Sequence, residues 1–240
     1  MKNKIVVLVM LLFSIIAIGQ EHKSDAISGK VKSFSFSPIH SNVSQVNGLV
    51  VGIGHYENKK IEHQRINGVN VEALHIMPLL IVPLRIDIPI NSIYMGLIYN
   101  ERSDFYFLED YERDTYLSMN GFNLSVGGFI GGANLNGLNI SLGSMTNEAN
   151  GVSIAPVINT SKVFNGLQIS ALANFSDTGK GMQLGISNVS ENLKGIQIGV
   201  FNKTVDQRGF QFGLWNRNAR RSLPFINWQF SKKKVKSKTS

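Results

Sequence analysis

The stretch GMQLGISNVSENLKGIQIGVFNKTVDQRGFQFGLWN, residues 181–216, decides the fold class of this 240-residue chain. It holds three copies of one unit, which open at Gly181, Gly195 and Gly209. In each copy, apolar residues occupy the first, third and fifth positions after the glycine, and an asparagine closes the unit. Alternation with a period of two predicts a half-buried strand, and asparagine suits the turn that follows. We therefore expect the apolar side chains to face a core and the glutamine, asparagine and serine side chains to form an exposed ladder.

The same unit recurs upstream. Gly151 and Gly166 open clear copies, and Gly121 and Gly137 open degenerate ones. Successive key glycines lie 14 to 16 residues apart. The polar segments between units, such as VSENLK and KTVDQR, have one central apolar residue. Each is expected to be a second short strand, or a turn that places one side chain inward, before the next glycine forms a tight corner.

Two all-β architectures can use such units. In a β-solenoid each unit is one coil, and the coils stack in parallel with equivalent residues in register. In an up-and-down antiparallel β-barrel or meander, alternate strands run in opposite directions, so the natural sequence period is two units. Repetition of the same Gly, Gln and Asn in every unit favours the solenoid, because each coil then meets the same environment. The antiparallel β-barrel or meander remains the alternative fold.

The repeats end in an atypical segment, WNRNARRSLPFINWQF, residues 215–230. A stacked fold needs such an end, because its last coil would otherwise expose a sheet edge. We expect Pro224 to block strand continuation and the side chains of Phe225, Ile226 and Trp228 to cover the apolar end of the stack. Three basic residues of this cap could contact an anion: Arg217, Arg220 and Arg221.

The units GIQIGVFN and GFQFGLWN, followed by RSLPFINW, resemble the uncharacterised exported surface-repeat proteins of Bacteroidetes and spirochaetes. The resemblance covers residues 121–228 and thins upstream to GHYENKKIE, residues 54–62, and INGVNVE, residues 66–72. It implies an exported protein of a bacterial envelope and supplies no active site. Relatives of this kind carry a lipid-attachment cysteine, whereas this chain has no cysteine.

The N-terminus predicts export. Lys2 and Lys4 precede an apolar run at residues 5–18, which is shorter than a membrane-spanning helix, and small residues follow at a cleavage position. We expect a signal peptide at residues 1–19, a divergent β-rich part at 20–119, the repeat region with its cap at 120–228, and a basic disordered tail at 229–240. The predicted location is the periplasm, the outer membrane or the cell surface.

The charge is concentrated at the C-terminus. The formal net charge is +8, and residues 231–240 contain five lysines. We expect the tail to make at most weak contacts with anionic surfaces. The chain has no interleaved aromatic and basic stripe, which argues against nucleic-acid binding. No cofactor is expected, and an envelope polymer or a protein is the kind of partner that a ladder of repeats could bind.

No pattern in the chain predicts catalysis. The histidines lack the spacing of a helical zinc motif, and a structural or solvated role is expected for His55 and His63. The acidic cluster of Glu109, Asp110, Glu112 and Asp114 lacks the glycine and spacing of a calcium loop. The sequence thus predicts a noncatalytic exported envelope protein that offers a structural or interaction surface. The alternatives are an integral outer-membrane β-barrel and a glycan- or lipid-acting enzyme.

Overall fold

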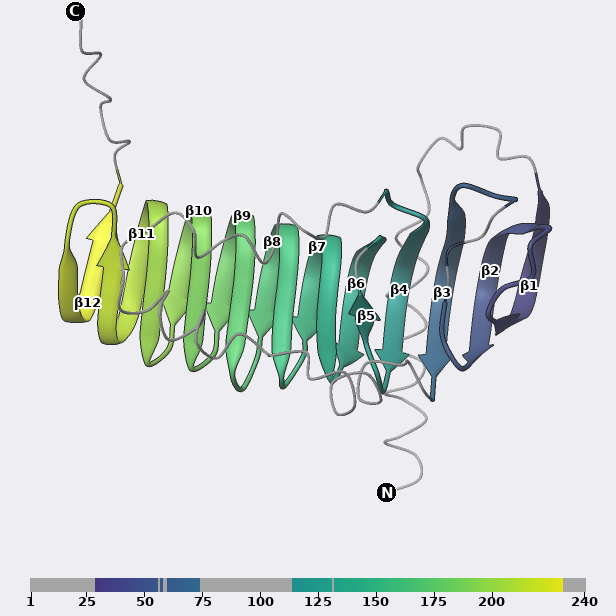
Figure 1. Cartoon of the computed structure of the whole chain (residues 1–240), viewed down its shortest axis with the longest axis horizontal. Coiled ribbons are helices and arrows are strands. Elements are labelled where there is room, and N and C mark those ends of the chain that lie inside the picture. The colour runs from purple at the N-terminus through teal and green to yellow at the C-terminus, as the bar shows by residue number, and fades with distance from the viewer. Residues whose placement is uncertain (1–28, 56, 58–59, 74–113, 131, 231–240) are drawn as a thin grey trace, which may run out of the picture.

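The computed structural model describes residues 29–55, 57, 60–73, 114–130 and 132–230, and every regular element in them is a β-strand (Figure 1). The strands are β1 (Lys30–Ser37), β2 (Val43–Gly52), β3 (Gln64–Glu72), β4 (Leu117–Ser125), β5 (Phe129–Ile130), β6 (Ala133–Ser141), β7 (Gly143–Ile154), β8 (Ile158–Ile169), β9 (Ala173–Leu184), β10 (Ser187–Ile198), β11 (Phe201–Asn218) and β12 (Ser222–Gln229). Within the described residues, no helix has the length and hydrophobicity needed to cross a lipid bilayer.

The strands form one continuous sheet that winds as a β-solenoid, as the one-unit repeat predicts. The pairing order is β1-β2-β3-β4-β6-β7-β8-β9-β10-β11-β12, with β5 paired to β7 at the side. All pairs from β1 to β11 are parallel, and Gly181, Gly195 and Gly209 lie side by side in register. Figure 1 shows the coils stacked along the long axis of the molecule. The parallel pairing confirms the solenoid and not the antiparallel alternative.

The key glycines lie within strands. In β10 the segment VSENLK and the apolar arm that follows form one strand, with Gly195 between them at a φ of 154°. A Cβ atom added to Gly195 would lie 1.8 Å from the carbonyl oxygen of Gly181 in the preceding coil. Equivalent glycines from Gly48 to Gly209 have the same close approach, at 1.8 to 2.3 Å. Glycine is therefore required both for the backbone angle and for the spacing between coils.

The two faces of the glycine-to-asparagine arm are reversed relative to our expectation. Gln183, Gln197 and Gln211, two residues after each glycine, are fully buried. Their apolar neighbours point outward, and Ile198 and Phe212 remain 38% and 37% exposed. The expected exposed ladder of Gln, Asn and Ser is thus wrong. A period of two identifies two faces, but it does not state which face is inside.

The buried amides are satisfied by one another. Gln197 Nε2 donates to Gln183 Oε1, and Gln211 Nε2 donates to Gln197 Oε1, both at 2.8 Å. Across the coil, Thr204 Oγ1 donates to Gln197 Oε1 at 2.8 Å. At the corner, Asn188 Nδ2 donates to Asn202 Oδ1 at 2.8 Å. Each amide thus has partners in its own coil and in the next, which removes the cost of burying it.

The apolar part of the core comes from another column of residues, two positions before each glycine. Its members in the N-terminal coils include Val46, Ile66, Met119 and Leu135, all buried. Further along, the ring of Phe164 occupies the space beside Gly179, where an added Cβ would lie 2.0 Å from Phe164 Cε1. A single apolar residue pointing inward from each inter-unit segment was expected. Leu193 agrees with this, but in KTVDQR the apolar Val205 is exposed and Gln207 takes the inward position that Leu193 has in the preceding coil.

The last strand closes the stack in a different way from the one expected. β12 pairs antiparallel with β11, and Pro224 lies inside it. Phe225, Ile226 and Trp228 are exposed and do not cover the core. Asn227 points inward instead, and its Nδ2 donates to Gln211 Oε1 at 3.1 Å. Without β12, the last coil would expose amide side chains that have no partner. The end of this stack therefore needs a polar cap.

Candidate functional site

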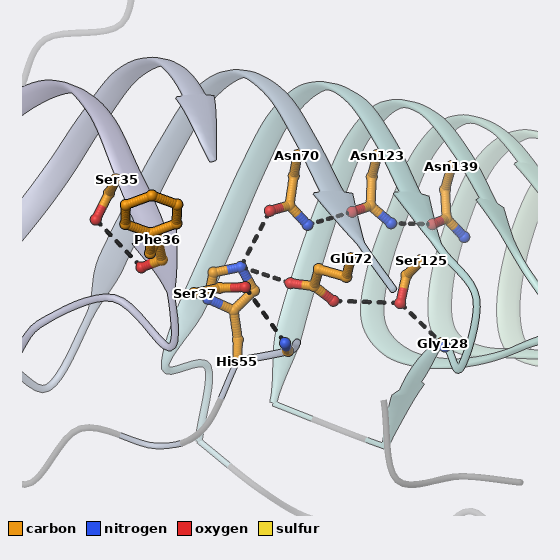
Figure 2. A network of polar contacts seen from close by, with 11 residues as sticks. Ser35, Phe36, Ser37, His55, Asn70, Glu72, Asn123, Ser125, Gly128 and Asn139 are labelled. Carbon is orange, nitrogen blue, oxygen red and sulfur yellow. Dashed lines mark hydrogen bonds and ion pairs between the residues drawn. The ribbon is translucent and has the colours of Figure 1, made fainter. Parts of the chain in front are cut away.

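The buried amide ladder has a defined N-terminal end at β3. Asn70 Nδ2 donates to Asn123 Oδ1 at 2.7 Å, and Asn123 Nδ2 donates to Asn139 Oδ1 at 2.6 Å (Figure 2). The residue that pairs with Asn70 in the preceding coil is Val50, which has no amide. His55 takes the place of that amide, with its Nε2 3.2 Å from Asn70 Oδ1.

The same imidazole contacts a buried carboxylate. His55 Nε2 lies 2.7 Å from Glu72 Oε1, and the side chains are 2% and 0% exposed. Ser125 Oγ donates to Glu72 Oε2 at 3.2 Å and accepts from Gly128 N at 3.1 Å. Since both groups facing Nε2 are oxygen acceptors, Nε2 carries the proton. Figure 2 shows this network as a connected set of side chains inside the coils.

The network of His55, Glu72 and Ser125 contains the residue types of a hydrolytic triad but not its order. A triad needs the histidine between the serine and the carboxylate, so that the imidazole can take the serine proton. Here Glu72 lies between the other two, and all three side chains are buried. The arrangement joins interior polar groups by hydrogen bonds, which agrees with the structural role expected for His55.

The other polar groups singled out in the sequence are dispersed. His40 Nδ1 lies 2.7 Å from Asn42 Oδ1, and His63 Nδ1 lies 2.9 Å from the carbonyl of Thr115. Among the described residues, no group of three or more His, Asp or Glu side chains could hold a metal ion. His22, His75, Glu109, Asp110 and Glu112 lie outside the described residues.

The interior offers no room for a substrate between β3 and β8. The cavity there has a volume of about 10 Å³ and is lined by ladder and core residues such as Asn123, Leu135, Ser153 and Phe164. That volume is about the size of one water molecule. A substrate therefore does not fit into this cavity.

The outside carries two unbroken apolar columns, one and three residues after each key glycine. We call them together the outer face. The first column is Leu49, Val69, Phe122, Leu138, Val152, Leu167, Met182, Ile196 and Phe210, and the second is Val51, Val71, Leu124, Ile140, Ile154, Ile169, Leu184, Ile198 and Phe212. On β12, Trp228 and Ile226 continue them opposite Phe210 and Phe212. With strands ~4.8 Å apart, the outer face is about 45 Å long.

A third column borders the outer face, one residue before each glycine. In the N-terminal coils it is asparagine, and these side chains bond to one another; Asn136 Nδ2 donates to Asn120 Oδ1 at 2.8 Å. In the last three coils the column becomes Lys180, Lys194 and Arg208, which lie in register. These three residues form the basic column. Within the described part of the chain, none of them makes a salt bridge.

Among the arginines of the cap, Arg221 makes several contacts within the protein. Arg221 Nε donates to Asn227 Oδ1 at 3.0 Å, and its Nη2 donates to the Trp228 carbonyl at 2.8 Å. The guanidinium also lies 4.4 Å from the centroid of the Trp228 ring. Arg221 thus holds β12 in place. An anion contact stays a prediction for Arg217, Arg220 and Arg221, of which Arg220 and Arg221 are exposed.

Sequence reasoning missed both the outer face and the basic column. A signal for the basic column was present, because the residue before each glycine changes from asparagine to Lys180, Lys194 and Arg208. The outer face could not be recognised, since its apolar residues resemble those of an ordinary core strand.

Comparison with known proteins adds no family. No protein-family model, curated protein or solved structure matches this chain. The resemblance to exported surface-repeat proteins therefore stays a prediction from the sequence.

Proposed function

We propose that this protein is a noncatalytic, exported protein of a bacterial envelope that binds another envelope component through its outer face. One observation carries the proposal: the solenoid encloses its amides and leaves two apolar columns outside along its whole length. Extended apolar patches on protein surfaces mark places of contact with other molecules. The predicted signal peptide supports the envelope location, and the surface-repeat resemblance agrees with it.

The closed interior supports a binding role over catalysis. Among the described residues, the buried pair of His55 and Glu72 terminates an amide ladder, and its carboxylate bonds to Ser125. Chemistry on a substrate would need these groups to reach a cleft. The outer face, by contrast, is regular and long, which suits an extended partner surface.

Fractionation of cells that produce the full chain tests the proposal. We expect the protein to lose residues 1–19, which N-terminal sequencing would detect, and to sediment with the envelope. A triple variant, Leu184→Thr, Ile198→Thr and Phe212→Thr, should shift to the soluble fraction because it interrupts the outer face while keeping strand propensity.

Val205→Thr is the matched control. Val205 is an exposed apolar residue on the opposite arm of its coil, so its replacement should leave sedimentation unchanged. The proposal is wrong if the protein stays in the cytoplasm with its leader attached, or if the triple variant sediments as the unmodified chain does.

A further inference from the structure

We propose that the partner of the outer face is an anionic lipid surface, on which the C-terminal coils lie flat with their apolar columns among the acyl chains. This inference rests on the proposed envelope function and adds the chemistry of what is bound. It draws on three observations: the hydrogen bonding of the sheet, the basic column, and the aromatic residues of the cap.

The first observation concerns the backbone. The outer face is the face of a sheet and not its edge, and its strands are paired on both sides from β2 to β11. Backbone N–H and C=O groups are therefore used between coils, as between Gly195 and its neighbours in β9 and β11. Hydrocarbon tolerates only backbone that is already hydrogen-bonded. An apolar sheet face of this kind can enter lipid without leaving backbone groups unsatisfied.

The second observation is the placement of charge. Lys180 and Lys194 are exposed, and Arg208 is half-buried. In its own strand, each of them stands two residues before a member of the first apolar column, which is Met182, Ile196 or Phe210. Long basic side chains can keep their charges at the headgroups while their stems lie along apolar surface. An anionic leaflet attracts such residues, and each contributes on the order of 1 kcal/mol near the surface. Five further lysines follow Phe230 in the sequence.

The third observation is the aromatic end of the outer face. Trp215 and Trp228 are 46% and 45% exposed, and Phe210, Phe225 and Phe230 of β11 and the cap are exposed as well. Phe210 stacks with Phe212 at 5.9 Å and meets Phe230 edge-on at 5.2 Å between ring centroids. Tryptophan is enriched where protein crosses from hydrocarbon to headgroups. Aromatic and basic residues thus gather at the same end of the solenoid.

A second copy of the chain is the competing occupant. Two outer faces packed together would bury apolar surface equally well. The column beside the outer face contains only asparagine, lysine and arginine, however, so a second copy would bring no anion from that column to the basic column. A negatively charged lipid surface instead complements those cations. Charge complementarity favours the lipid.

The chain contains a natural reporter for this contact. Its only two tryptophans are Trp215 and Trp228, both at the cap. The full chain is titrated with vesicles of phosphatidylcholine containing 30% phosphatidylglycerol, and with vesicles of phosphatidylcholine alone. We expect a blue shift of tryptophan emission with the anionic vesicles and a much weaker one with the neutral vesicles.

Two sets of variants assign the contact to its residues. Lys180→Gln, Lys194→Gln and Arg208→Gln together should weaken vesicle affinity about tenfold or more, whereas Lys162→Gln on the opposite arm should not. The triple threonine variant of the outer face should lose the blue shift, with Val205→Thr again unchanged. Circular dichroism of each variant confirms that the solenoid is folded. A chain ending at Phe230 should keep the blue shift, although it lacks the lysine-rich tail.

The results separate this inference from the proposed function. If the protein sediments with the envelope through its outer face but does not bind vesicles, the proposed lipid partner is wrong and a protein partner is indicated. Concentration-dependent dimerisation without vesicle binding would show that a second copy of the chain occupies the outer face instead. Equal binding to neutral and anionic vesicles, or complete loss of binding in the chain ending at Phe230, would also refute the inference.

Discussion

At the residue scale, the buried glutamines decide the interior of this molecule. Gln197 bonds to Gln183 and Gln211 in the coils on either side, and to Thr204 across the coil. A typical hydrogen bond contributes about 1 kcal/mol, but a buried polar group that loses its partner costs about 1 to 3 kcal/mol. The ladder therefore stabilises the fold mainly because interrupting it is expensive.

Two single substitutions at adjacent residues, one polar to apolar and one apolar to polar, test which face of the strand is buried. Gln197→Leu should lower the free energy of unfolding by about 3 kcal/mol, since it removes one hydrogen bond from each of the buried amides of Gln183 and Gln211 and leaves the hydroxyl of Thr204 without its acceptor. Ile198→Gln, on the outer face, should change stability by less than about 1 kcal/mol. Urea denaturation followed by circular dichroism measures both. If Ile198→Gln were the more damaging change, the apolar face would be the inner one.

At the element scale, β12 differs from every other strand because it reverses direction. It pairs with the free edge of β11 between Gly209 and Arg217, and its Asn227 forms the last hydrogen bond of the glutamine ladder. Arg221 stabilises β12 through a hydrogen bond to the Trp228 carbonyl and a cation–π contact with the Trp228 ring. An uncovered β11 would present unpaired N–H and C=O groups, which are a template for pairing with another chain.

Removal of β12 should therefore cause end-to-end association. A chain lacking residues 219–240 is expected to form oligomers that grow with concentration, as measured by analytical ultracentrifugation. The matched control lacks only residues 231–240, so that it loses the lysine-rich tail but keeps β12. Equal sedimentation of the two truncated chains would show that β12 does not protect the edge of β11.

At the scale of the whole molecule, each coil contacts only its neighbours. Ser187 pairs with Phe201 and with Ala173, so that one coil in this region is fourteen residues. In such a stack, stability is approximately a sum of coil terms and nearest-neighbour interfaces. The number of coils can change without altering the fold, provided that equivalent residues stay in register.

Deletion of one whole coil tests this modularity. Removing residues 187–200 joins Ile186 to Phe201 and places Asn202 over Asn174, so the ladders continue and the chain should fold cooperatively. Removing only residues 187–193 places unlike residues over one another and should unfold the C-terminal coils. Far-UV circular dichroism and resistance to protease distinguish the two. Similar behaviour of both deletions would contradict a register-dependent stack.

The sequence by itself determined the all-β class and the repeat of 14 to 16 residues, and it favoured parallel stacking over an antiparallel fold, because one-unit periodicity suits a stack in which every unit has the same environment. In the part expected to be β-rich at residues 20–119, the structure has the strands β1 to β3 and the start of β4. Residues 74–113 of that part, which include Glu109, Asp110 and Glu112 of the acidic cluster, lie outside the described residues.

Only the tertiary structure decided which face of the strands is inside. A glutamine is a poor core residue alone, and it becomes a good one when the next coil places another amide 2.8 Å away. That partner is fourteen residues distant along the chain, so local alternation carries no trace of it. The same is true of His55, which reaches Asn70 and Glu72 only after the coil has closed. Hydrogen bonding between coils turned the polar columns inward, and this left the apolar columns to meet the surroundings.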